Sequence, residues 1–429
     1  MTDTEKALVE ETLLEPTAPH GGALPPHLLA NRPFLWLVAS TGLSNLSFWC
    51  YFSVVWAQAS YRLHASAADM SILLGAFSLP FIMLVPLQGM VVDRWSPKWM
   101  NVLGLLVWVT AIPVAWAAHS LVLLDVSSLI TGIGVAAIPV TRSALIGLMV
   151  EERRLVQANG QISAAIQSAL IAGPLAAAFL FRAQGAGVVY AASLVVAALS
   201  VAFALAVPDL RHGGTRPSFR LADLGRGFLT SWRLAELRML LALYGVGWLV
   251  VNVLWTLEPL FLKHTMHLRS DAIQFMWAGH GAGALSGAIF MSRSRKGPGR
   301  ELALIGLGLA LNGVALVVYI ATATFPVALA ATAIGGIGFS FFLVSALALV
   351  QRVAGEEEWG RVTSVFAILQ EGTALVASAV IVGLGSLVVV RPALLVCGVV
   401  MGAVGLLGLA ALPRLETRRS TVPVDVHVG

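Results

Sequence analysis

The sequence predicts an all-α polytopic membrane protein with twelve transmembrane helices, arranged as two pseudo-symmetric six-helix bundles. The observations behind this prediction are a hydrophobic share of 58% with only 11% charged residues, a mean hydropathy of +0.85 and a series of long apolar runs. Soluble domains carry about 25% charged residues, and a helix needs about 20 mostly apolar residues to cross a bilayer. The short alternating segments typical of a transmembrane barrel are not seen in these runs.

The predicted spans follow one another along the whole chain. Their approximate ranges are 34–58, 70–92, 99–118, 121–149, 159–181, 185–207, 238–262, 270–292, 301–323, 326–350, 362–385 and 391–412. Cys50 and Cys397 lie inside apolar runs, so neither a disulfide framework nor a zinc site is expected. No cofactor and no metal are expected, because the sequence has no glycine-rich phosphate loop and no cluster of histidines and cysteines.

The placement of lysine and arginine predicts the orientation in the membrane. With the N-terminus inside, the outer loops hold only Arg62, Arg182, Lys263, Arg269 and Arg391 of the 27 basic residues. Both termini are therefore expected to be cytoplasmic, in a multi-pass protein of the cell inner (plasma) membrane. The net charge of +5 is mostly this topological signal, so nucleic acid is not expected as a partner.

Polar breaks divide the chain into bundles, a linker and tails. The expected parts are a disordered cytoplasmic tail (1–31), the first bundle (32–207), a cytoplasmic linker (208–237), the second bundle (238–412) and a second cytoplasmic tail (413–429). Within the linker, Leu221, Leu224, Phe228 and Trp232 lie near one helical face, which favours an interfacial helix. A solvated linker is the alternative.

The two halves of the chain resemble each other. "TGIGVAAIPV" at 131–140 aligns with "GGIGFSFFLV" at 335–344, an offset of 204. The same offset relates Gln167 to Glu371. Together these matches predict a duplicated six-helix unit, as in secondary transporters built from repeats around a site at the membrane midplane.

Residues 88–99, "QGMVVDRWSPKW", place three charges between the second and third apolar runs. Gly89 lets a neighbouring helix approach, while Asp93, Arg94 and Lys98 stand at the membrane surface, where a carboxylate pairs with a base in one conformation and releases it in another. We therefore expect a conformational latch. The alternative is that these bases only follow the rule for cytoplasmic loops.

This Gly-x-x-x-Asp-Arg-x-x-x-Lys pattern resembles the loop motif between the second and third spans of the major facilitator superfamily. Ser96 stands where the family usually has glycine, and Trp99 stands where it has a second basic residue. The resemblance covers about residues 32–412. It implies two six-helix halves that work by alternating access.

The fifth span is similar to the antiporter motif of the same superfamily. Gly160, Ala169, Gly173 and Pro174 stand at its positions, and several of the motif's other glycines are alanine here. The similarity implies export. The alternative is ordinary packing of small residues, which transmembrane helices use widely.

The stretch 139–174 resembles bacterial drug and siderophore exporters, including the enterobactin-exporter-like branch of drug:proton antiporters. Arg142 and the pair Ala158-Asn159 carry this similarity. Ser128 stands where many drug:proton antiporters have an arginine in the fourth span. Any proton coupling implied by the resemblance must therefore use other residues.

Ionisable groups at membrane depth are costly, and each is a candidate for proton coupling. Glu371 lies about 15 Å into the eleventh run, close to the midplane. His280 is similarly deep in the eighth run, while Glu258 and Asp125 lie nearer the outer surface. The alternatives are a hydrogen-bonded structural glutamate, a neutral histidine, and carboxylates that reach the interface.

A central cavity is expected where the family binds substrate. The candidates for its lining are Asn45, Trp49, Arg142, Gln167, Asn252, Trp255 and Phe342. A wide, aromatic and sparsely charged cavity suits an apolar or amphipathic organic compound better than a sugar phosphate or an amino acid.

The sequence thus predicts a secondary active transporter that exports small lipophilic or amphipathic organic compounds, such as a drug, an antibiotic or a siderophore-like compound, by alternating access and proton antiport. The expected partners are a small-molecule substrate, the lipid bilayer and the proton, and a monomer is expected. An importer of an organic nutrient is the alternative within transport. A non-transporting receptor is the alternative of another class, and no catalytic cluster points to an enzyme.

Overall fold

The structure, a computed structural model, describes residues 28, 31–92, 95–151, 154–210, 221–292 and 300–420. Six long helices precede a short helix, α8, and six follow it within these ranges, which confirms the all-α fold class. The helices are α2 (Arg32–Ala57), α3 (Ala67–Val92), α4 (Pro97–Trp116), α5 (Leu121–Met149), α6 (Leu155–Gln184), α7 (Ala186–Ala206), α8 (Leu221–Arg233), α9 (Ala235–His264), α10 (Ala272–Ser292), α11 (Arg300–Ala321), α12 (Phe325–Val353), α13 (Gly355–Leu384) and α14 (Val390–Ser420).

Ten of the described helices are long and apolar enough to cross a membrane, and α2 and α10 are the long helices outside that group. Helix α2 is outside the group because its sequence contains several polar side chains, and these side chains pack inside the bundle. Ser40 donates to the carbonyl of Ser200 at 2.9 Å and Ser47 to that of Ser193 at 2.7 Å, both on α7. These bonds between helices satisfy polar groups where water is excluded.

Local sequence sets the helix boundaries. Gly185, with φ +81°, ends α6 and starts α7 within a single residue, a conformation that glycine adopts without strain. Ser120 caps α5 by accepting a hydrogen bond from the Leu123 amide. Pro97 opens α4, where its missing N–H costs nothing.

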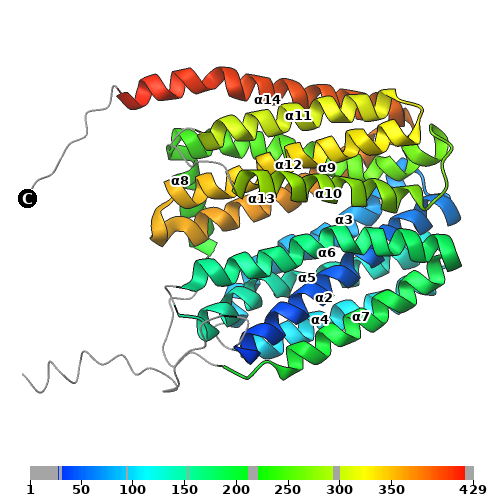
Figure 1. The fold of residues 1–429 in the computed structure, drawn as a ribbon, viewed down its shortest axis with the longest axis horizontal. Helices are drawn as coiled ribbons and strands as arrows, with labels where there is room; N and C mark the ends of the chain where they lie inside the picture. Colours follow the sequence, from blue (N-terminus) through cyan, green and yellow to red (C-terminus); the bar gives the residue numbers. More distant parts are fainter. Residues whose placement is uncertain are drawn as a thin grey trace, which may run out of the picture.

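The two halves repeat the same arrangement, with α2–α7 forming one group and α9–α14 the other (Figure 1). In the first half α2 packs against α6 and α7, and α4 packs against α5. In the second half α9 packs against α13 and α14, and α11 against α12.

Glycine pairs show the same repeat at atomic scale. On α4 and α5, a Cβ on Gly134 would stand 2.7 Å from the carbonyl oxygen of Gly104. On α11 and α12, a Cβ on Gly338 would stand 2.6 Å from the carbonyl oxygen of Gly308. Both residues of the first pair are offset from their counterparts by 204, the same offset that aligned the halves in sequence.

The halves meet along two helix pairs, α3 with α13 and α6 with α10. On the first pair Gly75 faces Ser378, with 3.7 Å between a built Cβ and the serine side chain. On the second pair Gly281 packs against Ile171, and the rings of Phe179 and Phe275 are 5.9 Å apart.

The linker contains the helix α8, which packs against α13. Gly227 makes the contact, because a Cβ there would lie 2.6 Å from the Arg361 carbonyl oxygen. Phe228 and Trp232 stack on each other with ring centres 6.0 Å apart, and both are exposed. The two exposed aromatic rings fit the interfacial helix predicted for this segment, which stays a prediction.

We expect Gly338→Ala to lower the melting temperature in detergent by several degrees. The added methyl group must separate α12 from α11, and such overpacking costs about 1–3 kcal/mol. Gly335→Ala on the same helix is the matched control, because its Cβ would meet Asn312 at an ordinary 3.5 Å. Equal melting temperatures for the two variants would contradict the close crossing.

Candidate functional site

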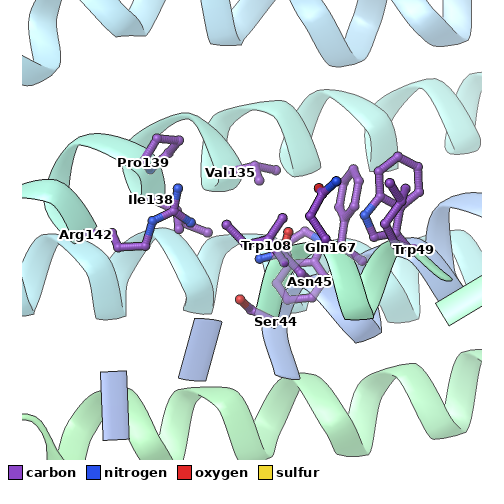
Figure 2. Close-up of a pocket in the computed structure, with 12 residues that line it drawn as sticks. Ser44, Asn45, Trp49, Trp108, Val135, Ile138, Pro139, Arg142 and Gln167 are labelled. Atoms are coloured by element: carbon purple, nitrogen blue, oxygen red, sulfur yellow. The ribbon is translucent and has the colours of Figure 1, made fainter. Parts of the chain in front are cut away.

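A cavity of about 250 Å³ lies within the first half, between α2, α4, α5 and α6 (Figure 2). Its lining residues are Ser44, Asn45, Phe48, Trp49, Trp108, Val135, Ile138, Pro139, Arg142, Ile166, Gln167 and Leu170. Most of the wall is apolar or aromatic. Polar groups enter it at a few points only, which is the usual composition of a small-molecule site.

The four helices place different chemistry along the cavity. Asn45 is fixed to its own helix, since its Nδ2 donates to the Thr41 carbonyl at 2.9 Å. Trp49 lies about two turns before α2 ends at Ala57, whereas Arg142 lies about two turns before α5 ends at Met149. Because these helix ends lie at opposite ends of the bundle, the cavity has an aromatic end and a cationic end.

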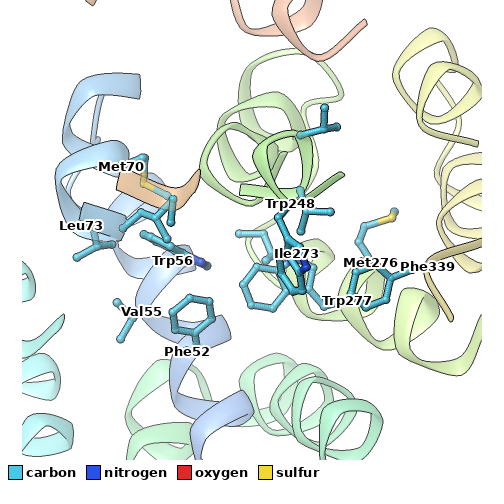
Figure 3. Close-up of a cluster of buried hydrophobic side chains, with 14 of the residues drawn as sticks. Phe52, Val55, Trp56, Met70, Leu73, Trp248, Ile273, Met276, Trp277 and Phe339 are labelled. Carbon is cyan, nitrogen blue, oxygen red and sulfur yellow. The ribbon is translucent and has the colours of Figure 1, made fainter. Parts of the chain in front are cut away.

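Aromatic side chains close the space between the halves beside Trp49. The Trp49 ring lies 6.2 Å from that of Trp255 and 6.4 Å from that of Trp277, in edge-to-face geometry. Phe52 adds a contact to Trp277 at 5.7 Å, and these rings belong to the larger buried cluster of Figure 3. Such pairs contribute about 0.5–1.5 kcal/mol each beyond the area they bury.

Polar contacts join the halves at the end of the bundle formed by residues 58–66 and 261–271, which we call the closed end. The Tyr61 hydroxyl donates to the Leu268 carbonyl at 3.0 Å, and the Lys263 ammonium donates to the Ser60 carbonyl at 2.6 Å. Arg182 of the first half lies 4.0 Å from Asp271 of the second. The structure therefore has its halves in contact at this end.

Glu258 of α9 is buried, with 2% of its surface exposed. Trp277 Nε1 donates to one carboxyl oxygen and the Tyr319 hydroxyl to the other, both at 2.8 Å. The carboxyl thus ties α9 to α10 and α11 without a cation. Through Trp277 it also contacts the rings that separate the cavity from the closed end.

Glu371 lies on the boundary between the halves. Ser78 of α3 donates to its Oε2 at 3.1 Å, and Gln370 donates to its Oε1 at 3.3 Å. Like Glu258, it is held by neutral donors. The hydrogen bond from Ser78 joins α3 of the first half to α13 of the second.

The other two coupling candidates have different surroundings. His280 of α10 packs its ring against Phe339, 5.3 Å between centres. Asp125 lies in the second turn of α5 near the closed end, and within the described ranges no hydrogen bond to its carboxylate is found. The four candidates are spread over four helices and do not form one cluster.

The structure brings four of the seven predicted cavity residues together, on α2, α5 and α6. These are Asn45, Trp49, Arg142 and Gln167. Trp255 is adjacent, through its contact with Trp49. The other two are buried in the packing of the second half.

The buried pair belongs to helix contacts. Asn252 is 4% exposed and donates to Thr373 of α13 at 3.2 Å. Phe342 is 1% exposed and packs on Tyr244 and Phe339. Neither lines the cavity of the first half.

The latch segment is described only in part. Asp93 and Arg94 lie outside the described residues, and Gly89 is described only as part of the helix α3. Lys98 stands with its ammonium 5.1 Å from the centre of the Trp99 ring. Next to it, Ser96 hydrogen bonds to Asp209, so the start of α4 is tied to the end of the first half. The latch stays a prediction.

Among the antiporter-like residues of α6, Gly173 packs closely against α2. A Cβ on Gly173 would lie 2.6 Å from that of Trp49, and Cys50 donates to the Gly173 carbonyl at 3.0 Å. Ala169 is buried, whereas a Cβ on Gly160 would meet nothing within 4 Å. The close contact brings α6, with its Pro174, against the helix that carries the aromatic end of the cavity.

The match to a protein-family model shows to which family the chain belongs. The model described as Major Facilitator Superfamily matches residues 37–369, with a second match over 240–425. The chain belongs to the Major Facilitator Superfamily. This confirms the family resemblance of the sequence and places the protein among transporters of the membrane rather than among enzymes.

Two bacterial relatives of this superfamily chain come from Bacillus subtilis (strain 168). An uncharacterized MFS-type transporter, YfiS, is 42% identical over 62 residues, which cover 14% of this chain and 15% of that protein. Multidrug resistance protein 1 is 23% identical over 300 residues, or 69% of this chain and 76% of that protein.

Solved transporters share the fold at low sequence identity. A POT family transporter in complex with a thioalcohol-conjugated peptide has a TM-score of 0.72 at 12% identity, covering 90% of this chain and 96% of that one. The nucleoside transporter NupG gives 0.66 at 13%, covering 89% and 99%. A bacterial homologue of the lysosomal transporter Spinster gives 0.65 at 15%, covering 92% and 98%.

Sequence reasoning missed several groups of the site. Trp108 lines the cavity from α4, and Tyr319 holds Glu258 from a helix 61 residues away. No signal in the sequence indicates which face of α4 or α11 points inward, because both helices are apolar all round. The spacing of Phe48 and Phe52 on one face of α2 could have indicated the aromatic wall.

We expect Glu258→Leu to lower the melting temperature more than Tyr319→Phe does. The first change leaves two buried donors without an acceptor, at about 1–3 kcal/mol each, while the second removes one hydrogen bond worth about 1 kcal/mol. Thermal unfolding of the detergent-purified variants measures the difference. A Glu258→Leu protein as stable as wild type would rule out the two hydrogen bonds.

We expect the double variant Tyr61→Phe with Lys263→Met to loosen the closed end. Hydrogen–deuterium exchange should become faster in peptides covering residues 58–66 and 261–271, because both hydrogen bonds between the halves at this end are gone. Arg391→Gln is the control, as its guanidinium bonds the Ala321 carbonyl within the second half. Unchanged exchange in the double variant would show that the aromatic rings and the Arg182–Asp271 pair are enough to hold this end.

Proposed function

We propose that this superfamily member is a secondary active exporter of small lipophilic or amphipathic organic compounds, working by alternating access and driven by proton antiport. The observation that carries the proposal is the cavity of the first half, with Trp49, Phe48 and Trp108 on its walls and the amides of Asn45 and Gln167 among them. Aromatic faces with few polar groups bind flat apolar compounds with little demand on their exact shape.

The contacts between the two halves at one end of the bundle support alternating access. The halves touch through Tyr61 and Lys263 at the closed end, and through the ring of Trp277 between that end and the cavity. If the termini are cytoplasmic, as the arginine and lysine distribution predicts, the closed end faces outward. The cavity then takes compounds from the cytoplasmic side, and export requires these contacts to break.

Glu371 is the preferred proton carrier among the four candidates. Its carboxyl bonds Ser78 across the boundary between the halves, so gaining or losing a proton changes a bond that must be broken or remade as the halves move. Glu258 acts within the second half, where it positions Trp277 at the aromatic closure. The distant relationship to a multidrug resistance protein supports a lipophilic substrate.

We expect inside-out vesicles containing the purified protein to accumulate lipophilic dyes when their interior is acidic. Glu371→Gln should reduce this accumulation at least tenfold while leaving dye exchange without a gradient intact, because the amide can accept from Gln370 and donate to the Ser78 hydroxyl but cannot be ionised by losing a proton. Glu301→Gln, which alters a carboxylate on α11 paired with Arg352, is the matched control.

The outcomes separate the alternatives. Full gradient-driven accumulation by Glu371→Gln would move coupling to Glu258, His280 or Asp125. Accumulation in right-side-out instead of inside-out vesicles would replace the exporter with an importer. Specific binding of a dye without flux in either vesicle orientation would support the alternative of a non-transporting receptor.

A further inference from the structure

We propose that the cavity of the first half binds an organic anion, an aromatic or otherwise apolar body with a carboxylate or sulfonate group, and that Arg142 is the partner of that group. The proposal rests on the transport function above and names its substrate class. The proposal narrows the substrate class from lipophilic or amphipathic compounds in general to those that carry a negative charge. The juxtaposition that carries it is an unpaired guanidinium at one end of an aromatic cavity.

Arg142 differs from the other arginines whose partners are seen. Arg182 and Arg269 lie 4.0 and 3.6 Å from Asp271, and Arg352 lies 3.3 Å from Glu301. For Arg142, which is partly buried, no carboxylate and no hydrogen-bond acceptor is found within the part of the chain that the structure describes. A guanidinium carries five N–H donors and keeps its charge under all cellular conditions.

A charge without a counter-ion at this depth is costly and needs a functional reason. The cavity wall does not supply the partner, because none of its described lining residues is acidic. Both Ser44 and Asn45 already donate to the Thr41 carbonyl, at 3.0 and 2.9 Å. Arg142 and Gln167 therefore offer donors to a ligand on this wall, together with the Trp108 indole N–H, for which no partner is found among the described residues.

The geometry orients the ligand. Arg142 stands on the side of the cavity nearer the end of α5, and Trp49 on the side nearer the end of α2 (Figure 2). An anion held by Arg142 and Gln167 would place its apolar body against Phe48, Trp49 and Trp108. A planar carboxylate or a sulfonate matches the fork of the guanidinium, which binds two oxygens at once.

A lipophilic cation fits this wall less well. It would find aromatic faces, but the same space already holds a positive charge. The buried carboxyls of Glu258 and Glu371 are bonded to neutral donors on or beside the second half and do not line this cavity. The positive charge of Arg142, with no carboxyl beside it on the cavity wall, therefore disfavours lipophilic cations as ligands.

The test is equilibrium dialysis of the detergent-purified full chain with three probes of matched shape: 2-naphthylacetate, 2-naphthylacetamide and 2-(2-naphthyl)ethylamine. Wild type should bind the carboxylate about tenfold more tightly than the amide, and the amine most weakly. Arg142→Gln should remove the preference for the carboxylate, and Arg142→Lys should restore part of it. Arg233→Gln, an exposed arginine on α8, should behave as wild type.

A second measurement needs only the wild-type protein and covers the case in which Arg142→Gln does not fold. Phenylglyoxal modifies accessible arginines, and mass spectrometry locates the product. The naphthylacetate should protect Arg142 from modification, while the acetamide should not. Equal affinities for the carboxylate and the amide, or a carboxylate preference that survives in Arg142→Gln, would overturn the proposal, as would protection by both probes.

Binding in detergent is independent of flux, so this test and the vesicle experiment can fail separately. Dye accumulation in the vesicles, combined with no preference for the carboxylate probe in the binding test, would support the exporter and refute the anion site. A carboxylate preference lost in Arg142→Gln, without flux in either vesicle orientation, would leave the anion site and refute transport.

Discussion

Backbone contact at glycine is the constraint on which the rest of this structure depends. In a bilayer no hydrophobic force brings apolar helices together, so close approach must come from packing and from hydrogen bonds between helices. Gly104 against Gly134 and Gly308 against Gly338 allow two helix pairs to cross with their backbones touching. Because the crossing is repeated in both halves, it fixes the same scaffold twice. The cavity of the first half uses one of these crossings directly, since Trp108 follows Gly104 by one turn on its inner face.

Much of the fold could be read from the sequence because bilayer thickness sets helix length. The fourth predicted span, 121–149, coincides with α5, and the second, 70–92, differs from α3 only at its start. The internal offset of 204 predicted the duplication that the glycine crossings display. The largest differences are at the polar ends of α6, α13 and α14, which continue past the apolar runs into charged residues. Hydropathy carries no information there, because a helix in water or at the membrane surface has no reason to be apolar.

The site was less predictable because the sequence does not show how each helix is rotated about its own axis. A helix that is apolar all round gives no hydrophobic face to read, so the sequence could name Asn45, Arg142 and Gln167 but not the Trp108 beside them. It also named Phe342 for the cavity, yet that ring packs on Tyr244 inside the second half. Glu258 shows the same limit, since its donors come from two other helices. Contacts between segments far apart in sequence depend on the assembled bundle.

The two halves share a scaffold but divide the chemistry. The buried carboxyls of Glu258 and Glu371 lie in the second half and are held by neutral donors, whereas the first half has a guanidinium, that of Arg142, in an aromatic cavity. A hydrogen bond from Ser78 to Glu371 and the rings of Trp49 and Trp277 link the two. An anionic compound in the cavity would neutralise Arg142, and the loaded cavity would then be less costly to move through an apolar environment than the empty one. Protonation of a carboxyl lowers the same cost for the other half. In the proposed antiport cycle the anion-loaded cavity would favour the outward step and the protonated carboxyl the return step, so the two loaded states would have to alternate.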